Sequence, residues 1–384
     1  MRAREFFKED TAQTRVLGGF AVKVIPTKEP DLEEAIELDA PHRRISRDEM
    51  QGLAGRIKSG TKTTKDKMGP YIHQKQIVIT KSDDPNDVWD LDDLAEKISR
   101  RPRSLIGTNA KMEKSTHENE RIYDITLPAL KGIVIDEETG EFVEITTCPS
   151  AGDCKSFCYA RKGGYIIYPA SSMAAGRALN FLVNDPEGYA DVVDAEIRIQ
   201  SRLRPKGNKL IVRWHDAGDF FSKKYLDLAY DVARKNPTVD FYAYTKVADY
   251  ALGDAPANFS MNFSSGAKHT EQTKVTQHVE AGNIVKQGIT VPRVMFWDLI
   301  ARNGNAIIKD EQDRTQFKDD ASLQIFKQRL AKAYNVHPST IITYDQMMKL
   351  PVGPDPKWNV IVQPGAGDRA ANRKDVIISF LMFH

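Results

Sequence analysis

From residue 141 onwards, the chain alternates short apolar runs with longer stretches in which apolar residues recur every three or four positions. Short apolar runs predict strands, and the wider spacing predicts amphipathic helices. Strands that alternate with helices build a parallel sheet of βα units. We therefore expect an α/β fold, a partial TIM-like (β/α)6 barrel over residues 121–384. Its six strands are expected at 142–146, 210–214, 240–244, 259–263, 290–296 and 358–362.

The sequence predicts the boundaries of two helices. Ser222 is an expected N-cap, and the helix after it ends before Pro237. Its apolar positions repeat at three- and four-residue spacing: Tyr225, Leu228, Ala229, Val232 and Ala233. The first 120 residues show weak periodicity, apart from a short helix predicted at 91–98 and a break at Pro102. We interpret 1–120 as an irregular α+β extension of the barrel domain 121–384.

Composition limits the classes of protein to which the chain is expected to belong. The 384 residues are 41% hydrophobic and 28% charged, as in a soluble globular protein, and no apolar run of about 18 residues is present to span a membrane. The basic start, Met1-Arg2-Ala3-Arg4, is not followed by the apolar core of a secretory signal. A cytoplasmic location with reduced thiols is therefore expected.

One segment is strongly basic although the net charge is only +2. Residues 43–75 carry nine Lys and Arg against Asp48, Glu49 and Asp66, and they are rich in glycine. Such a segment is either an arm that lies along the phosphates of DNA or a nucleotide, or a solvated surface loop.

The three cysteines of the chain lie within eleven positions of one another, at Cys148, Cys154 and Cys158. Three thiols in one loop favour a single metal centre over a disulfide framework or inert packing. Three thiolates with one open position suit a [4Fe–4S] cluster. Structural zinc is the alternative, and it requires a fourth protein ligand from elsewhere.

Other polar residues follow the predicted strands, where βα folds carry their sites. His215 and Asp216 form an acid/base pair or support metal ligands through hydrogen bonds; the alternative is a histidine that is hydrogen-bonded for structural reasons. Tyr244 and Lys246 are candidates for a hydrogen-atom donor or for a charge that holds a substrate in place. The alternative is that they only pack in the interior. Asp219 is either a cofactor contact or the cap of the helix that begins near Ser222. Further candidates are Ser264 and Ser265 after the fourth strand, and Asp368 and Arg369, which bind an anion or form a surface ion pair.

Three stretches together resemble the phage and plasmid "gene product 88" family, over the chain from Asn109 to its C-terminus. They are Cys148-Pro149-Ser150-Ala151-Gly152-Asp153-Cys154 through Cys158-Tyr159-Ala160, His215-Asp216-Ala217-Gly218-Asp219-Phe220-Phe221-Ser222, and Phe241-Tyr242-Ala243-Tyr244-Thr245-Lys246. The resemblance implies phage-related relatives, and the host cytoplasm if the gene is carried by a phage. It supplies little mechanism.

A three-cysteine loop after the first strand of a six-unit barrel also resembles the radical S-adenosylmethionine (SAM) superfamily, although the spacing here is C-x5-C-x3-C rather than C-x3-C-x2-C. The resemblance implies that the three cysteines bind a [4Fe–4S] cluster, that its open iron binds SAM, and that an electron donor is a partner. It implies that Gly218 and Asp219 contact the methionine amino group and that Ser264 and Ser265 meet the ribose. The other implied cofactor contacts are Tyr159, the loop 364–367, Asp368 and Arg369.

Three functions follow from these features. The leading hypothesis is a radical-SAM-like iron–sulfur enzyme that modifies nucleic acid or a nucleotide. The first alternative is a zinc-containing barrel that modifies or exchanges DNA bases, with Asp216 or Asp219 as nucleophile. The second is a non-catalytic DNA-binding protein in which a metal only holds a loop in place.

Overall fold

The structure, a computed structural model, divides into two compact units that each draw on several chain segments. The first unit comprises Met1–Gly107, Ile125–Leu203 and His215–Asn236, and the second comprises Thr108–Asp124, Arg204–Trp214 and Pro237–His384. The described residues are 14–17, 20–25, 35–38, 41–51, 90–109, 112–113, 119–137, 139–158, 160, 169–203, 208–292, 295, 307–309, 315–363 and 369–382.

The first unit contains a six-stranded sheet in which every neighbouring pair is antiparallel. All positions of its last two strands are buried, because they pack on apolar residues of the unit's core. In sheet order the strands are β1 (Thr14–Leu17), β2 (Phe20–Ile25), β3 (Ala35–Leu38), β4 (Pro41–Ile45), β8 (Phe142–Ile145) and β7 (Gly132–Ile135).

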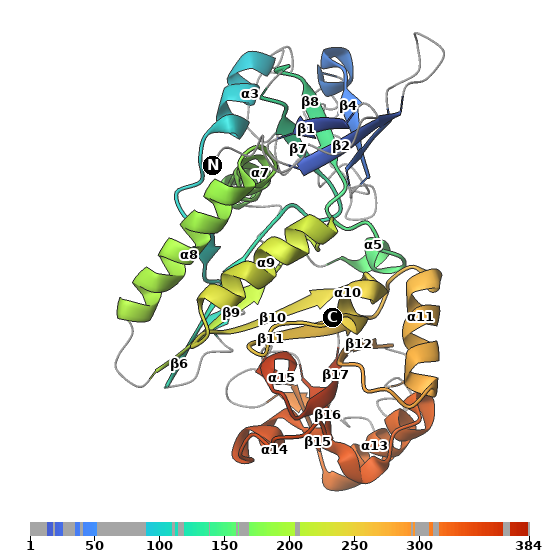
Figure 1. Cartoon of the computed structure of the whole chain (residues 1–384). Helices are drawn as coiled ribbons and strands as arrows, with labels where there is room; N and C mark the ends of the chain where they lie inside the picture. The colour runs from blue at the N-terminus through green and yellow to red at the C-terminus, as the bar shows by residue number, and fades with distance from the viewer. Residues whose placement is uncertain are drawn as a thin grey trace. The chain divides into compact units, whose positions relative to one another are not determined.

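Helices of this unit pack against the sheet and against one another. Helix α3 (Leu91–Ser99) packs on α7 (Pro169–Asn184), and both contact β7. Helix α8 (Pro186–Leu203) lies beside α7 and α9 (Lys223–Lys235), as Figure 1 shows. The predicted helix at 91–98 is α3, and the predicted cap Ser222 begins α9 by accepting the N–H of Tyr225. Both predictions are confirmed.

The larger sheet has nine strands, and each neighbouring pair from β9 to β15 is parallel. Buried parallel strands carry nearly continuous apolar runs, which is the pattern at 210–214. In sheet order the strands are β15 (Ile341–Thr343), β16 (Trp358–Val362), β17 (Val376–Met382), β12 (Gln287–Val291), β11 (Phe259–Ser264), β10 (Asp240–Thr245), β9 (Lys209–Trp214), β6 (Glu120–Ile125) and β5 (Ile106–Gly107).

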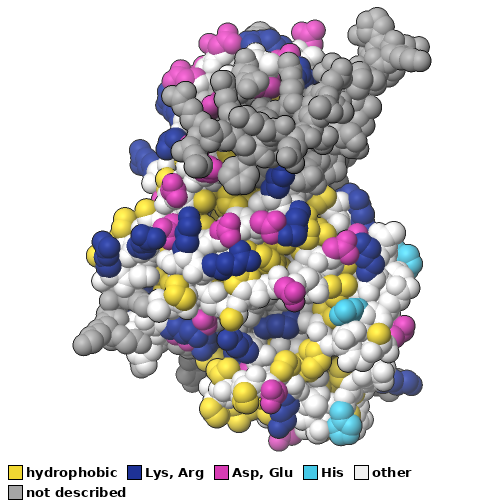
Figure 2. Space-filling model, viewed as in Figure 1, with side chains coloured by type: hydrophobic (Ala, Val, Ile, Leu, Met, Phe, Trp, Pro, Cys, Tyr) yellow, Lys and Arg dark blue, Asp and Glu magenta, His cyan; other side chains and the backbone are white. Residues whose placement is uncertain are grey.

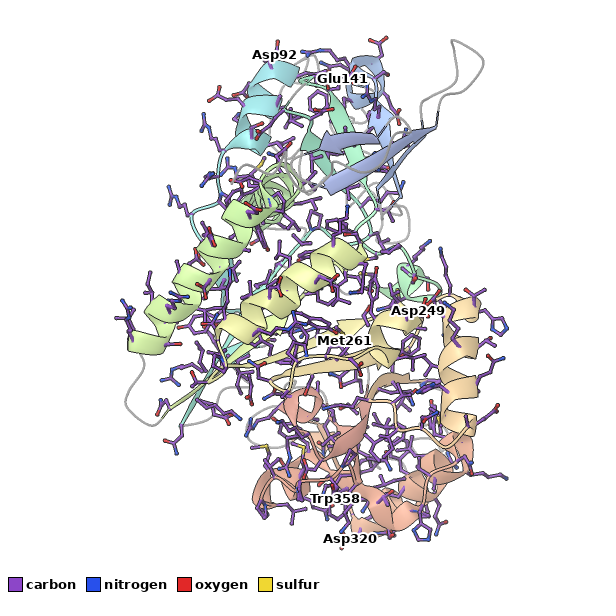
Figure 3. The ribbon with its side chains drawn as sticks, in the orientation of Figure 1. Asp92, Glu141, Asp249, Met261, Asp320 and Trp358 are labelled. Atoms are coloured by element: carbon purple, nitrogen blue, oxygen red, sulfur yellow. The ribbon has the colours of Figure 1, made fainter. Side chains whose placement is uncertain are left out.

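Helices of the second unit cover its strands. Helix α10 (Ala248–Leu252) packs on β11 and on α11 (His269–Glu280), and Asp249, labelled in Figure 3, forms an ion pair with Lys274 at 2.9 Å. Apolar residues of β12, β15, β16 and β17 pack on α13 (Asp320–Tyr334). Six shorter elements complete the described part of the chain: the strands β13 (Ile307–Lys309) and β14 (Thr315–Phe317), which pair antiparallel, the helices α5 (Cys154–Phe157), α14 (Tyr344–Lys349) and α15 (Arg369–Asn372), and the 3-10 helix η4 (Pro338–Thr340).

The α/β class is confirmed, but the described residues form no closed barrel. The strand predicted at 142–146 is β8, which pairs antiparallel with β4 and β7 and is not the first parallel strand. The pattern misled because β8 is buried at every position, as a parallel strand would be. The strand predicted at 290–296 is also wrong in its bounds: β12 ends at Val291, before Pro292.

Two surface properties fit the composition. Lys and Arg side chains are interspersed with Asp and Glu side chains over the viewed face in Figure 2, and the chain contains the two kinds in nearly equal numbers. Within the described residues, no helix has the length and apolar character needed to cross a bilayer.

Candidate functional site

Three loops of the first unit meet at one place, which we call the three-loop junction: residues 126–131, 146–158 and 215–222. Backbone hydrogen bonds join them in each direction. Leu127 N donates to Ala217 O at 3.1 Å, Asp219 N to Thr147 O at 2.9 Å, and Thr147 N to Leu130 O at 3.0 Å. The Thr147 hydroxyl also donates to Pro128 O at 2.6 Å. The junction is therefore built mainly from main-chain bonds.

Each of two junction loops contains a residue in a strained backbone conformation. Leu130 has a φ of 65° and His215 a φ of 69°, in the left-handed region that bulky residues rarely adopt. Gly218 has a φ of 88°, and a Cβ there would lie 2.9 Å from the Leu127 Cβ. Strain of this kind persists where the surroundings enforce it, and it concentrates at functional sites.

The three predicted metal ligands all lie in the second junction loop. Leu130 N donates a hydrogen bond to Cys148 Sγ at 3.3 Å. Cys154 begins the short helix α5 (Cys154–Phe157), and Cys158 packs against a small apolar cluster that includes Ala129 and Ala217. All three thiols are half-buried, and none forms a disulfide.

The donor set is chemically suited to a metal, but it is not preassembled. Among the described residues, no group of three or more His, Cys, Asp or Glu side chains is arranged to hold a metal ion. A metal would therefore have to draw the thiols together. Tyr159, the predicted cofactor contact beside Cys158, lies outside the described residues.

His215 is enclosed by aromatic rings. Its Nε2 lies 2.8 Å from the Tyr225 hydroxyl, and its ring centroid is 4.5 Å from that of Phe220. This environment fits the structural reading of His215 raised from the sequence. Asp216 beside it is also buried, and its backbone N–H donates to Ile125 O at 3.0 Å.

Asp219 is 2% exposed, and its carboxylate accepts the N–H of Phe220 at 2.8 Å. It does not cap α9, because Ser222 fills that position. The reading of Asp219 as a helix cap is wrong. Its backbone bond to Thr147 brings Gly218 and Asp219 beside the cysteine loop.

A second group of predicted residues comes together in the second unit, at the carboxyl ends of β10 and β11. Lys246 Nζ lies 3.2 Å from Ser264 Oγ, and Ser265 Oγ accepts the N–H of Thr290 at 2.7 Å. Parallel strands end at the same sheet edge, which explains why these residues meet. We call Lys246, Ser264 and Ser265 the strand-end cluster.

Tyr244 precedes this cluster on β10. The Arg213 guanidinium lies 5.5 Å from the centre of its ring, within cation–π range. A Cβ at position 288 would lie 2.4 Å from the ring, so only glycine leaves room for it. Tyr244 therefore packs inside the second unit, in line with the packing alternative drawn from the sequence.

The predicted anion contacts have a more ordinary environment. Arg369 pairs with Glu120 at 2.6 Å, and Asp368 lies outside the described residues.

The described arginines of the basic segment 43–75 also pair with carboxylates. Arg43 bonds Glu49 at 2.7 Å and Glu144 at 3.1 Å, and these bonds raise the pKa of the guanidinium against the cost of burial. Arg44 pairs with Glu141 and Arg47 with Asp92.

A family model described as Gene product 88 matches residues 101–334. The chain belongs to this family. The gene product 88 match covers the whole three-loop junction and the strand-end cluster, but not β15, β16, β17 or Arg369. The match gives no evidence for a likeness to radical SAM enzymes. Neither a curated protein nor a solved structure matches the chain.

Within this gene product 88 chain, sequence reasoning missed the junction loop 126–131. Its contribution comes from main-chain groups of Leu127, Pro128 and Leu130, which have no side-chain signature. The available signal was Pro128, three residues after the end of β6, which indicates a turn but not its partners.

Proposed function

We propose that the three-loop junction holds a metal centre through Cys148, Cys154 and Cys158, and that the protein is an iron–sulfur enzyme acting on nucleic acid or a nucleotide. The clustering of all the chain's thiols in one loop carries this proposal. It is supported by the N–H bond that Cys148 Sγ accepts from Leu130, since such bonds stabilise metal-bound thiolates.

Iron–sulfur is favoured over zinc by the number of donors. A structural zinc site takes four protein ligands, whereas a [4Fe–4S] cluster with three cysteines keeps one iron open. The loop supplies three cysteines, one donor fewer than such a zinc site takes. A bound cluster would supply one-electron chemistry at this place.

The same proposal includes SAM as the small-molecule partner. The role that we assign to Asp219 is to accept hydrogen bonds from the amino group of SAM, with Gly218 allowing close approach of the backbone. The bond from Asp219 N to Thr147 O, which keeps this loop beside the cysteines, supports the assignment.

Metal analysis after anaerobic purification tests the centre. The wild type should be brown and contain about four irons per chain. Cys154→Ala should lose colour and iron, whereas Ser156→Ala, a control in the same short helix, should keep both. A colourless protein with one zinc would instead favour the base-modifying alternative. A protein without metal even after reconstitution would contradict all three hypotheses, because each of them places a metal in the cysteine loop.

The SAM part has a separate test. Reduced, iron-loaded protein is incubated with SAM, and 5′-deoxyadenosine is measured by chromatography. Asp219→Asn keeps an oxygen for the Phe220 N–H but removes the charge, so we expect a reduced yield with unchanged iron content. No 5′-deoxyadenosine from iron-loaded wild type would refute SAM cleavage and leave the metal proposal intact.

A further inference from the structure

The first unit carries a concentration of guanidinium groups that the metal site does not use. Arg100, Arg101 and Arg103 follow the end of α3, and Arg177 lies on the neighbouring helix α7. We call these four residues the arginine cluster. Arg100 and Arg101 have side chains that are 56% and 66% exposed, and Arg103 is also exposed.

The backbone under the cluster is firmly held. Arg177 Nε donates to Lys97 O in the last turn of α3, at 2.7 Å. Just beyond Arg103, the Glu196 carboxylate accepts the backbone N–H groups of Leu105 and Ile106 and the hydroxyl of Ser104, at 2.9 to 3.1 Å. A fixed backbone lowers the ordering cost of binding.

Positive charge exceeds negative charge at this surface. Glu96 pairs with Arg100 at 2.6 Å and Asp185 with Arg101 at 3.0 Å. Arg103 and Arg177 form no ion pair with a carboxylate in the part of the chain that the structure describes. The pKa of Arg177 is lowered, first by burial and then by the charges of Arg100 and Arg103, so the guanidinium groups repel one another. An incoming anion would relieve this repulsion.

We propose that the arginine cluster binds phosphates of a nucleic-acid backbone. Guanidinium groups match phosphate oxygens with paired hydrogen bonds, and a polyanion releases counterions when several of them bind together. Within the cluster, Arg103 and Arg177 have no carboxylate partner among the described residues, so their charge is available to a phosphate. Only the kind of partner rests on the proposed function.

Fluorescence anisotropy with a labelled DNA duplex, over a series of salt concentrations, tests the proposal on the full chain. Arg100→Gln with Arg103→Gln should weaken binding roughly tenfold and reduce the slope of log K against log salt by about two, because each lost phosphate contact removes about one unit. The control double variant Lys223→Gln with Arg234→Gln removes the same charge from exposed positions on α9. It should bind like the wild type.

Arg103→Lys keeps the charge and should retain the salt slope. Equal slopes for the cluster variant and the α9 control would overturn the proposal. Binding of polyglutamate but not of DNA would overturn it too, because the partner would then be an acidic protein. Iron content of the cluster variant should stay at the wild-type value, so loss of DNA binding and failure of the metal proposal are separable results.

Discussion

At the scale of single residues, Gly218 determines the path of the loop after β9. Its φ of 88° already favours glycine, and a Cβ would also lie 2.9 Å from the Leu127 Cβ and 3.4 Å from Pro128 O. The residue thus combines a conformational requirement with a packing requirement. Gly140 has a similar φ of 71°, but its added Cβ would meet nothing within 4 Å.

A comparison of these two glycines separates the energetic cost of backbone strain from the cost of a steric clash. Gly140→Ala should lower the free energy of unfolding by about 1 kcal/mol, the cost of a Cβ in the left-handed region. Gly218→Ala should lower it by about 3 kcal/mol, because the clash with Leu127 adds to that cost. Urea unfolding followed by circular dichroism measures both. Equal losses would show that the loop has room for a side chain.

Lys286 is a residue whose charge the fold disfavours. Burial lowers the pKa of its amine from 10.5 to about 8, although the amine donates to Arg373 O at 2.8 Å and Ala371 O at 3.1 Å. The unfolded chain therefore binds more protons at this position between pH 8 and 10.5. The contribution of Lys286 to the free energy of unfolding must therefore rise with pH across that window.

We expect the difference in unfolding free energy, wild type minus Lys286→Met, to increase from pH 8 to pH 10.5. Urea titrations at several pH values give this difference directly. Lys268→Met removes a charge from an exposed position of the same unit and serves as the control. A difference that falls with pH would contradict the assigned direction.

At the scale of elements, one buried ion pair ties the end of α14 to the start of β17. Arg373 bonds Asp375 through two nitrogens, at 2.8 and 2.6 Å, and donates to the carbonyls of Met347, Leu350 and Pro351. Asp375 is 1% exposed, and its pKa is lowered because bonds from Arg373 and from Gly353 N outweigh the effect of burial.

Asp375→Asn should therefore be costly. It leaves a buried guanidinium without its counter-charge, and we expect a loss of about 3 kcal/mol in the free energy of unfolding. Asp355→Asn, at an exposed position nearby, should change stability by less than about 0.5 kcal/mol. Chemical denaturation of both variants checks the pair. A loss below about 1 kcal/mol for Asp375→Asn would mean that water replaces the bond.

The edge of the larger sheet is protected by local bonds. Ile341 N–H donates to Pro338 O, and Thr343 N–H donates to Gln346 Oε1 at 3.0 Å. The backbone N–H groups of residues 341 and 343 point to the same side of the strand, because strand geometry repeats every two residues. Satisfying both N–H groups within the chain discourages pairing with another molecule.

At the scale of the whole molecule, the cysteines and the strand-end cluster belong to different units. The three-loop junction lies in the first unit, and Lys246, Ser264 and Ser265 lie in the second. Metal binding at the junction should consequently stabilise the first unit, since a ligand that binds only the folded form adds its binding free energy.

Thermal unfolding with and without iron and sulfide reconstitution tests this linkage. Metal at a hundredfold excess over its dissociation constant should add about 2.7 kcal/mol, seen as a higher Tm. Cys148→Ala and Cys158→Ala should show no rise, and Ser156→Ala should behave like the wild type. A rise that survives loss of either cysteine would place the metal elsewhere.

The sequence by itself determined the local features. Apolar runs located β9, β10, β11 and β16, and the Ser222 cap with its apolar stripe located α9. The short spacing of Cys148, Cys154 and Cys158 placed all three thiols in one loop. These features depend on neighbours a few positions away, so periodicity, capping and spacing report them directly.

Tertiary structure decided which strands pair and which loops meet. Burial at every position made β8 read like a parallel strand, and only its pairing with β4 and β7 assigned it to the antiparallel sheet. The junction contacts of Leu127, Leu130 and Thr147 use main-chain groups, which every residue carries. Pairing and loop contact are long-range properties of the folded chain, and residue type encodes them only weakly.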